Sequence, residues 1–444
     1  MSRLGAVLLW SVIAAAFIGP GTVTTAATAG VNHGYALLWA VLFSTGACLV
    51  LQEAAARLTV VSGRNLGQAL RETYPGGIRG AVVLLLVLGA VVLGCAAYQA
   101  GNILGGVVGA ALMIPMSRQV LTIAIGAVAA MLLLLGAPGA VAKALGVVVG
   151  IMGVCFLGTA VLLRPSLTEL VAGSLVPSVP AGAGVLALGL VGTTVVPYNL
   201  FLGSGLAKGQ KLSDIRFGLT VAVILGGLIS MGVLVVGAAL EPPFSFLRIS
   251  EFLSGQLGGW AATAFAVGLL AAGLSSAVTA PLAAAVTVSS LFGRGSRRWS
   301  PASWRFRSVW GGVLVVGVAF GVSEARPVPV IIAAQAFNGV LLPLVAVFLL
   351  LAVNDRRLMG SAGLNGRFSN VIMGGVAGAA LLLGTRGVLG AVAVLSGQSD
   401  LASAKSVLTG FTLAALVSVP IVARAVMSRR RISIQQDSRG ELDE

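Results

Sequence analysis

Long apolar runs dominate this chain, and polar residues gather in the short segments between them. A run of about 20 apolar residues is long enough to cross a bilayer as a helix. Twelve such runs are present, so the pattern predicts an all-α integral membrane protein of one polytopic domain. The runs cover residues 7–30, 35–57, 80–110, 118–135, 138–163, 184–207, 215–240, 258–292, 308–323, 328–353, 369–395 and 404–428.

Helix breakers interrupt the first and the sixth run. The first contains Gly-Pro-Gly at residues 19–21, and the sixth contains Val-Val-Pro-Tyr-Asn at residues 195–199. Hydrocarbon offers no water to the backbone groups that a break frees, so a break must be buried in protein or line a cavity. Two such breaks at matching positions in two halves of a chain are typical of the binding site of a secondary transporter.

The spacing of the breaks predicts two repeats. Each break begins a set of five runs, and because five is odd the second set enters the membrane from the opposite side. The predicted repeats are residues 7–163 and 184–353 within a transmembrane domain 1–428, followed by a polar cytoplasmic tail, 429–444. Residues 369–428 then form one or two extra helices, since Arg386 leaves a total of eleven runs open.

Composition and charge support a multi-pass protein of the cell membrane. Of 444 residues 57% are hydrophobic and 9% are charged, against about 25% charged residues in soluble domains. With the N-terminus and C-terminus cytoplasmic, 22 of the 28 Lys and Arg residues fall in cytoplasmic segments, as the positive-inside rule requires. The net charge of +15 therefore belongs to loops, and we expect no nucleic-acid partner.

Side chains typical of catalysis are scarce in the runs. We find no paired carboxylates, Cys/His set or Ser/His/Asp arrangement there, so we expect no enzyme activity and no cofactor. The expected partners are the bilayer and a transported solute or ion, with a monomer favoured. Glu53 and Arg57 stand four residues apart, which predicts an ion pair on one helix face.

The segment GPGTVTTAATAGVNHGYALLW from Gly19 resembles the NRAMP family of proton-coupled metal transporters, which reads D-P-G-N at this break. The resemblance continues in LQEAAARL, GTTVVPYNLFLGS, FAVGLLAAGLSSAVTAPLA and QAFNGVLLP, and so covers about the first ten runs. It implies the LeuT/APC-type fold, with two inverted five-helix repeats and broken helices 1 and 6, and transport by alternating access.

The chain departs from the family pattern at the binding site. The Asp and Asn of D-P-G-N, both metal ligands in the family, are Gly19 and Thr22 here. The family Met and His of the sixth helix are Val196 and Tyr198, whereas the family residues at Asn199 and Gln335 are retained. The resemblance implies a divergent branch whose site has lost its carboxylate, thioether and imidazole.

The positions of the family's proton route are also neutral. Its Asp and Glu on the third helix align with Gln99 and Asn102, and a second His of the sixth helix aligns with Gly203. None of these side chains titrates, which predicts weak or absent proton coupling.

Hydroxyl, amide and backbone oxygens remain at the breaks. They suit a largely hydrated hard cation better than a transition metal, which favours sulfur, imidazole or carboxylate ligands. Three hypotheses stay open: a metal-cation transporter of altered selectivity, a transporter of an amino-acid-like or carboxylate solute held by the helix N-terminus near Thr22, and a non-transporting membrane sensor. The candidate substrate-binding residues are Gly19, Pro20, Gly21, Thr22, Thr193, Val196, Tyr198, Asn199 and Gln335; Thr22, Thr193 and Gln335 are the candidate metal ligands.

Overall fold

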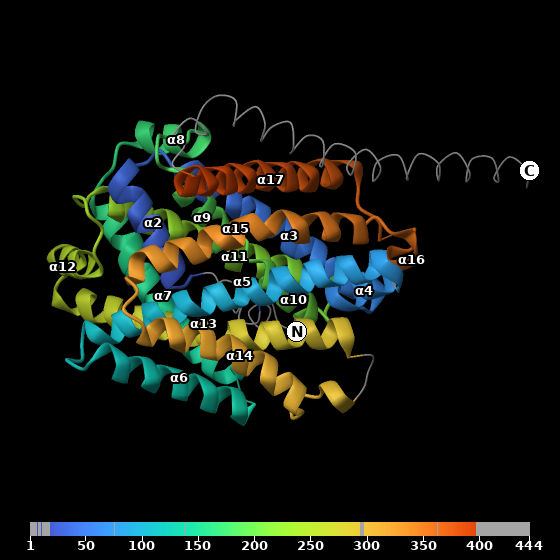
Figure 1. Ribbon diagram of the computed structural model, residues 1–444. Coiled ribbons are helices and arrows are strands. Elements are labelled where there is room, and N and C mark those ends of the chain that lie inside the picture. The colour runs from blue at the N-terminus through green and yellow to red at the C-terminus, as the bar shows by residue number, and fades with distance from the viewer. Residues whose placement is uncertain are drawn as a thin grey trace, which may run out of the picture.

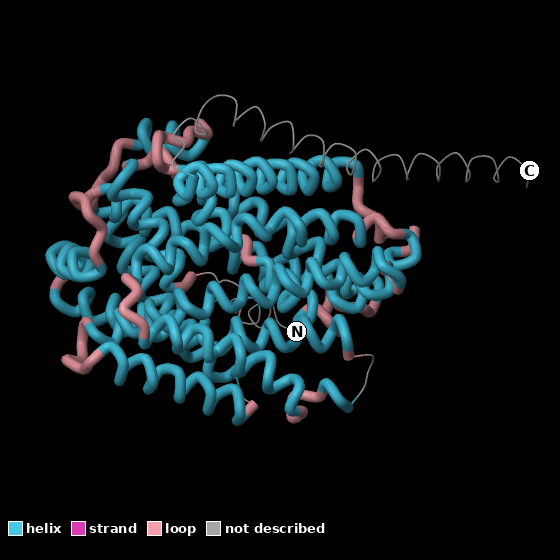
Figure 2. The backbone as a smooth tube through the Cα atoms, viewed as in Figure 1, coloured by secondary structure: helices cyan, strands magenta, loops and turns pink. Residues whose placement is uncertain are grey.

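Helices make up every regular element in the part of the chain that the computed structural model describes. This part comprises residues 18–396, apart from 75, 137, 294–296 and 362, together with Val7 and Trp10. Figure 1 shows the long helices lying side by side in one bundle, and Figure 2 shows short loops joining them at its two ends. The predicted all-α class is confirmed within these residues.

Ten spans in the described part are long and apolar enough to cross a membrane. One of them combines two half-helices, α9 and α10. The helices are α2 (Pro20–His33), α3 (Leu38–Ser62), α4 (Leu66–Thr73), α5 (Gly77–Ala111), α6 (Arg118–Leu135), α7 (Pro138–Leu162), α8 (Leu167–Leu175), α9 (Gly184–Thr194), α10 (Pro197–Leu206), α11 (Leu212–Ala238), α12 (Phe246–Leu257), α13 (Gly259–Phe292), α14 (Trp304–Val322), α15 (Pro327–Ala352), α16 (Arg356–Met359) and α17 (Arg367–Ser396).

Predicted and observed boundaries agree closely for most runs. The start of α14 differs: the apolar run predicted residue 308, but the helix begins at Trp304 because the Ser303 hydroxyl caps it by accepting from the backbone N–H of Phe306 (3.3 Å). The twelfth run, 404–428, the tail, 429–444, and most of the chain before the first break lie outside the described residues.

The helix packing follows the predicted inversion. The broken helix of the first repeat, α2, packs against α11 of the second repeat. In the same way the broken helix of the second repeat, α9 with α10, packs against α3 of the first. The short helices follow the same rule: α4 and α12 occupy equivalent places in the two sets and lie at opposite ends of the bundle in Figure 1. A pseudo-twofold arrangement of this kind brings the two breaks together at mid-bundle.

Glycines let the helices approach closely around the breaks. Gly105 of α5 faces the ring of Pro20, and a Cβ there would overlap that ring. Gly192 of α9 faces the backbone of Gln335 and Gly339 on α15 in the same way. Small residues at such crossings are how membrane helices pack without a hydrophobic force between them.

Candidate substrate site at the two helix breaks

The first break lies at Gly19. Its backbone is extended (φ −121°, ψ −175°), and α2 begins at the next residue, Pro20, whose missing N–H costs nothing at the first helical position. The sequence predicted a helix start near Thr22, but the helix begins two residues earlier, at Pro20. The backbone N–H of Val23 donates to the Gly19 carbonyl (3.2 Å), which leaves the N–H groups of the first turn directed toward the break.

The second break separates α9 from α10. The first half-helix ends at Thr194, Val195 and Val196 are non-helical, and Pro197 begins the next half-helix. In an 18-residue apolar window of this span 89% of the residues are buried, so the freed backbone groups are held inside protein, as a break in hydrocarbon requires.

A hydrogen bond joins the two breaks. The Thr22 and Thr193 hydroxyls lie 2.8 Å apart, although 171 residues separate them in the chain. Both side chains are buried, at 1% and 2% exposed. The structure thus brings together two candidate metal ligands that sequence alone could place only on separate helices.

Gln335, the third candidate ligand, reaches the first break from α15. Its side-chain amide covers Gly21 so closely that a Cβ there would overlap it. Gln335 is 1% exposed, and no hydrogen-bond partner for its Oε1 atom is present among the described residues. A buried amide oxygen beside a helix break is an available ligand for a cation.

Tyr198 and Asn199 lie in the first turn of α10, directly after the second break. Both are 1% exposed. The described residues provide no hydrogen-bond partner for the Tyr198 hydroxyl or for either amide atom of Asn199. Val196 is equally buried but supplies only an apolar surface where the family has a sulfur ligand.

Among the described residues, several more polar atoms near the breaks have no hydrogen-bond partner. Leaving one such buried group unsatisfied costs about 1–3 kcal/mol, so a cluster of them marks a place where a ligand or water completes the bonding. Within the described part of the chain, this set includes Thr25, Asn102 and Ser276, whose hydroxyl lies 3.4 Å from the Cβ position of Gly19.

The three residues that align with the family's proton route are buried and uncharged. The Gln99 amide donates to the carbonyl of Ala277 on α13 (3.1 Å), which ties α5 to α13 as an ordinary interhelical bond. The Asn102 Nδ2 atom has no partner in the described part. Gly203 leaves room for the side chain of Gln52 on α3, which a Cβ would overlap.

Sequence analysis missed Tyr98, the residue before Gln99. Its hydroxyl lies 3.1 Å from the Gly192 carbonyl and 3.2 Å from the Thr193 carbonyl. Its ring packs edge-on against Tyr198, with centroids 5.7 Å apart. One signal was available: Tyr98 and Asn102 stand four residues apart and so share a helix face.

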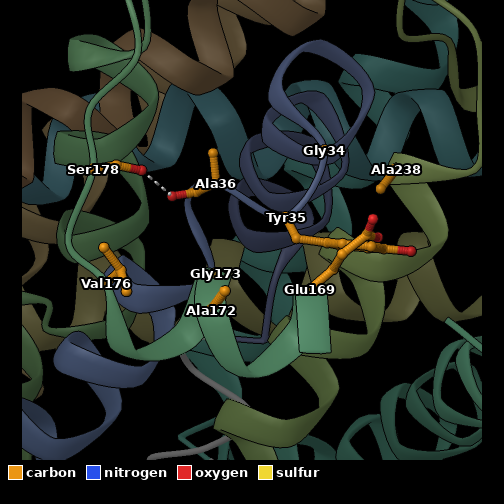
Figure 3. Close-up of a pocket in the computed structure, with 9 residues that line it drawn as sticks. All are labelled: Gly34, Tyr35, Ala36, Glu169, Ala172, Gly173, Val176, Ser178 and Ala238. Carbon is orange, nitrogen blue, oxygen red and sulfur yellow. Dashed lines mark hydrogen bonds between the residues drawn. The ribbon is translucent and has the colours of Figure 1, made fainter. Parts of the chain in front are cut away.

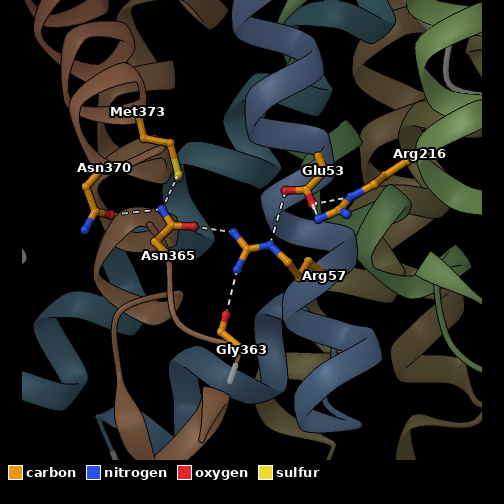
Figure 4. A network of polar contacts seen from close by, with 7 residues as sticks. All are labelled: Glu53, Arg57, Arg216, Gly363, Asn365, Asn370 and Met373. Carbon is orange, nitrogen blue, oxygen red and sulfur yellow. Dashed lines mark hydrogen bonds and ion pairs between the residues drawn. The ribbon is translucent and has the colours of Figure 1, made fainter. Parts of the chain in front are cut away.

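The candidate residues at the two breaks carry no formal negative charge. The described residues hold no group of three or more His, Cys, Asp or Glu able to bind a metal ion. Glu53 is engaged elsewhere in α3, by the predicted pair with Arg57 (3.2 Å) and by Arg216 (2.7 Å). Figure 4 shows this carboxylate between the two guanidinium groups.

A pocket lies just beyond the end of α2 and is lined in part by Gly34, Tyr35 and Glu169. It has a volume of about 680 Å³ and lies where Tyr35 and Glu169 run alongside each other (Figure 3). Partial burial, and then the charge of Glu169, raise the pKa of the Tyr35 phenol. Tyr35 therefore stays protonated at neutral pH, and the single carboxylate gives this pocket little chemistry of its own.

Comparison with known proteins gives consistent results. The family model for natural resistance-associated macrophage protein-like proteins matches residues 11–390. The chain is 29% identical over 393 residues to the divalent metal cation transporter MntH of Acidiphilium cryptum, covering 84% of this chain and 87% of that protein. It is 31% identical over 297 residues to MntH of Deinococcus radiodurans, covering 63% and 67%.

Solved structures share the fold. A manganese transporter of Eremococcus coleocola, crystallised with an aromatic bis-isothiourea compound, superposes with a TM-score of 0.71 at 20% identity, covering 97% of this chain and 95% of that one. The nucleobase-cation-symport-1 family transporter Mhp1, in a closed conformation, gives 0.55 at 17% identity, covering 95% and 93%. The LeuT-type fold is therefore confirmed, and the family match over residues 11–390 shows that the chain belongs to the natural resistance-associated macrophage protein-like (Nramp) family of transporters.

Proposed function

We propose that this protein moves a metal cation across the membrane by alternating access around the two helix breaks. The observation that carries the proposal is the meeting of the breaks at Thr22 and Thr193, in a chain that belongs to a transporter family. The relatives from Acidiphilium cryptum and Deinococcus radiodurans are named divalent metal cation transporters, which favours a cation over an organic solute.

The proposed selectivity differs from that of a manganese or iron transporter. The donors at the breaks are hydroxyl and amide oxygens, with backbone carbonyls beside them. Oxygen ligands suit hard cations such as Mg²⁺ and Ca²⁺, whereas softer transition metals gain most from sulfur and imidazole. Val196 and Tyr198, which stand where the family has Met and His, support this shift.

Proton coupling is proposed to be weak or absent. Gln99 and Asn102 cannot carry a proton at physiological pH, and the Gln99 amide is bonded to the Ala277 carbonyl. The cation then moves down its own gradient or with another ion.

The proposed topology places both termini in the cytoplasm, because 22 of the 28 Lys and Arg residues then lie on that side. Residues 7–163 and 184–353 are the two proposed repeats. Both breaks and all the candidate site residues come from one chain, which supports a monomer as the transporting unit.

A binding screen on the purified protein tests the proposal. A ligand that binds only the folded state raises the unfolding temperature, so we expect Mg²⁺ or Ca²⁺ to stabilise the wild type and Thr22→Val to lose most of this effect. Thr287→Val is the matched control, since in the described part of the chain its hydroxyl bonds only within α13, to the Ala283 carbonyl (2.8 Å).

Uptake into proteoliposomes decides between the functions. Accumulation of the same divalent cation, reduced in Thr22→Val and kept in Thr287→Val, supports cation transport. Stabilisation and uptake of amino acids or small carboxylates, with no response to metal ions, would contradict it.

A further inference from the structure

The last turn of α9 brings a set of backbone carbonyl oxygens to the second break. A helix leaves its last carbonyls without intrahelical partners, and these carry the negative end of the helix dipole. In transporters with broken helices, such carbonyls coordinate cations. Those of Gly192 and Thr193 are therefore candidate cation ligands beside the Thr22–Thr193 contact.

The Tyr98 hydroxyl hydrogen-bonds to both of these carbonyls. Its hydroxyl lies 3.1 Å from the Gly192 oxygen and 3.2 Å from the Thr193 oxygen. A phenol has one proton to donate, so it shares that proton between the two carbonyls. The tyrosine comes from α5, and its ring is 3% exposed and fixed against the ring of Tyr198 (interplanar angle 85°).

We infer that Tyr98 is a specificity-determining residue that acts by competition: its phenol holds the Gly192 and Thr193 carbonyls, and a cation gains these oxygens only by displacing it. This inference rests on the proposed cation transport. A cation that keeps its water shell can be bound through water without displacing the phenol. A cation that sheds water to take carbonyl ligands must first break the tyrosine bond.

The competition predicts which ions the tyrosine disfavours. Ca²⁺ takes carbonyl oxygens readily and in flexible geometry, whereas Mg²⁺ is dehydrated only reluctantly. Removing the phenol oxygen therefore favours Ca²⁺ more than Mg²⁺. One hydrogen bond is at stake, which corresponds to a change of about three- to tenfold in affinity.

Tyr98→Phe tests the inference, with Tyr74→Phe as the matched control. Tyr74 follows α4 as its C-cap residue and packs edge-on against Phe348, with ring centroids 6.1 Å apart. Tyr74→Phe therefore also removes a phenol hydroxyl, but one that does not bond the carbonyls at the second break. We expect the Kd for Ca²⁺ to fall about three- to tenfold in Tyr98→Phe, the Kd for Mg²⁺ to change less, and both to stay at the wild-type value in Tyr74→Phe. Binding is measured by isothermal titration and by the shift in unfolding temperature.

The opposite results are equally clear. If Tyr98→Phe binds Ca²⁺ no more tightly than the wild type, with an unchanged Ca²⁺/Mg²⁺ ratio, Tyr98 is a structural brace and the inference is wrong. If the wild type binds both ions and Tyr98→Phe does not alter the selectivity, the proposed function is still supported. A wild type that binds neither ion overturns both.

A measurement on the wild type covers the case in which Tyr98→Phe does not fold. The chain has four tyrosines, and the ultraviolet absorbance of a phenol responds to loss of its hydrogen bond. We expect saturating Ca²⁺ to give a tyrosine difference spectrum that persists in Tyr74→Phe. Binding of Ca²⁺ without any such spectrum would overturn the inference.

Discussion

The candidate substrate site at the two breaks, here called the central site, and the charged network around Arg57 both bury polar groups between helices. They differ in how far those groups find hydrogen-bond partners. In the network, Arg57 is only 12% exposed and bonds Glu53, the Gly363 carbonyl (2.7 Å) and Asn365. Asn365 in turn donates to Asn370 (2.9 Å). Figure 4 shows this chain of contacts running from α3 to the segment that leads into α17.

The central site has the opposite character. Tyr198, Asn199 and Gln335 are as buried as any side chain in the network, yet each keeps at least one polar atom for which the described residues offer no partner. Satisfied buried networks make a structure rigid, whereas unsatisfied ones reduce its stability. The network therefore ties α3 to the segment that leads into α17, whereas the polar atoms at the breaks have no such partners among the described residues.

Breaking the network gives the largest expected effect. Arg57→Ala removes the guanidinium and leaves Asn365 and the Gly363 carbonyl without a charged partner, so we expect the free energy of unfolding to fall by about 3 kcal/mol. Arg216→Ala is the control: its side chain is 56% exposed, and such a pair contributes less than about 1 kcal/mol. Denaturant unfolding in detergent measures both, and equal losses would show that the network is not the stabilising unit.

Adding the metal ligands of the family to the central site gives the second-largest expected effect. Gly19→Asp with Val196→Met supplies a carboxylate and a thioether, and a Cβ at Gly19 makes only an ordinary contact, 3.4 Å from the Ser276 hydroxyl. We expect Mn²⁺ affinity to rise about tenfold or more, measured by titration and by competition with Cd²⁺. Micromolar Mn²⁺ uptake by the wild type would contradict the proposed selectivity.

Displacing Gln335, a candidate ligand, gives a smaller expected effect. A Cβ in Gly21→Ala overlaps the Gln335 amide, and because the end of a flexible side chain can shift, the stability loss should stay within about 1 kcal/mol. Displacing the amide should raise the KM for cation uptake several-fold with little change in unfolding temperature. Gly46→Ala on α3, where a Cβ meets nothing within 4 Å, is the control. A large loss of stability at unchanged KM would place Gln335 in packing alone.

The smallest expected effect is that of pH. Neither Gln99 nor Asn102 titrates, so cation flux should vary little between about pH 5.5 and 7.5, the range in which a histidine relay would act. Uptake at several pH values, with a pH-sensitive dye inside the vesicles, provides the measurement. Acidification of the lumen in strict proportion to uptake, unaffected by Glu53→Gln, would show that a proton route persists.

The agreement between sequence and structure is best where the signal is local. Apolar runs located the helices that cross the bundle, including α6 at both of its ends. Short polar helices such as α4 and α12 carry too little hydrophobic signal to be recognised in a pattern of long apolar runs. The cap at Ser303 likewise extended α14 into a segment with charged residues, which hydropathy alone reads as loop.

Local patterns predicted the long helices, the two breaks and the neutral character of the donors, because hydrophobicity, Gly-Pro chemistry and side-chain type are properties of single segments. Which donors meet depends instead on how the helices pack. Three contacts at the breaks join different helices: Thr22 with Thr193, the Gln335 amide with Gly21, and the Tyr98 hydroxyl with the Gly192 carbonyl at the end of α9. Such contacts depend on how inverted halves pack through their glycines, which is a relation between distant segments that no local pattern encodes.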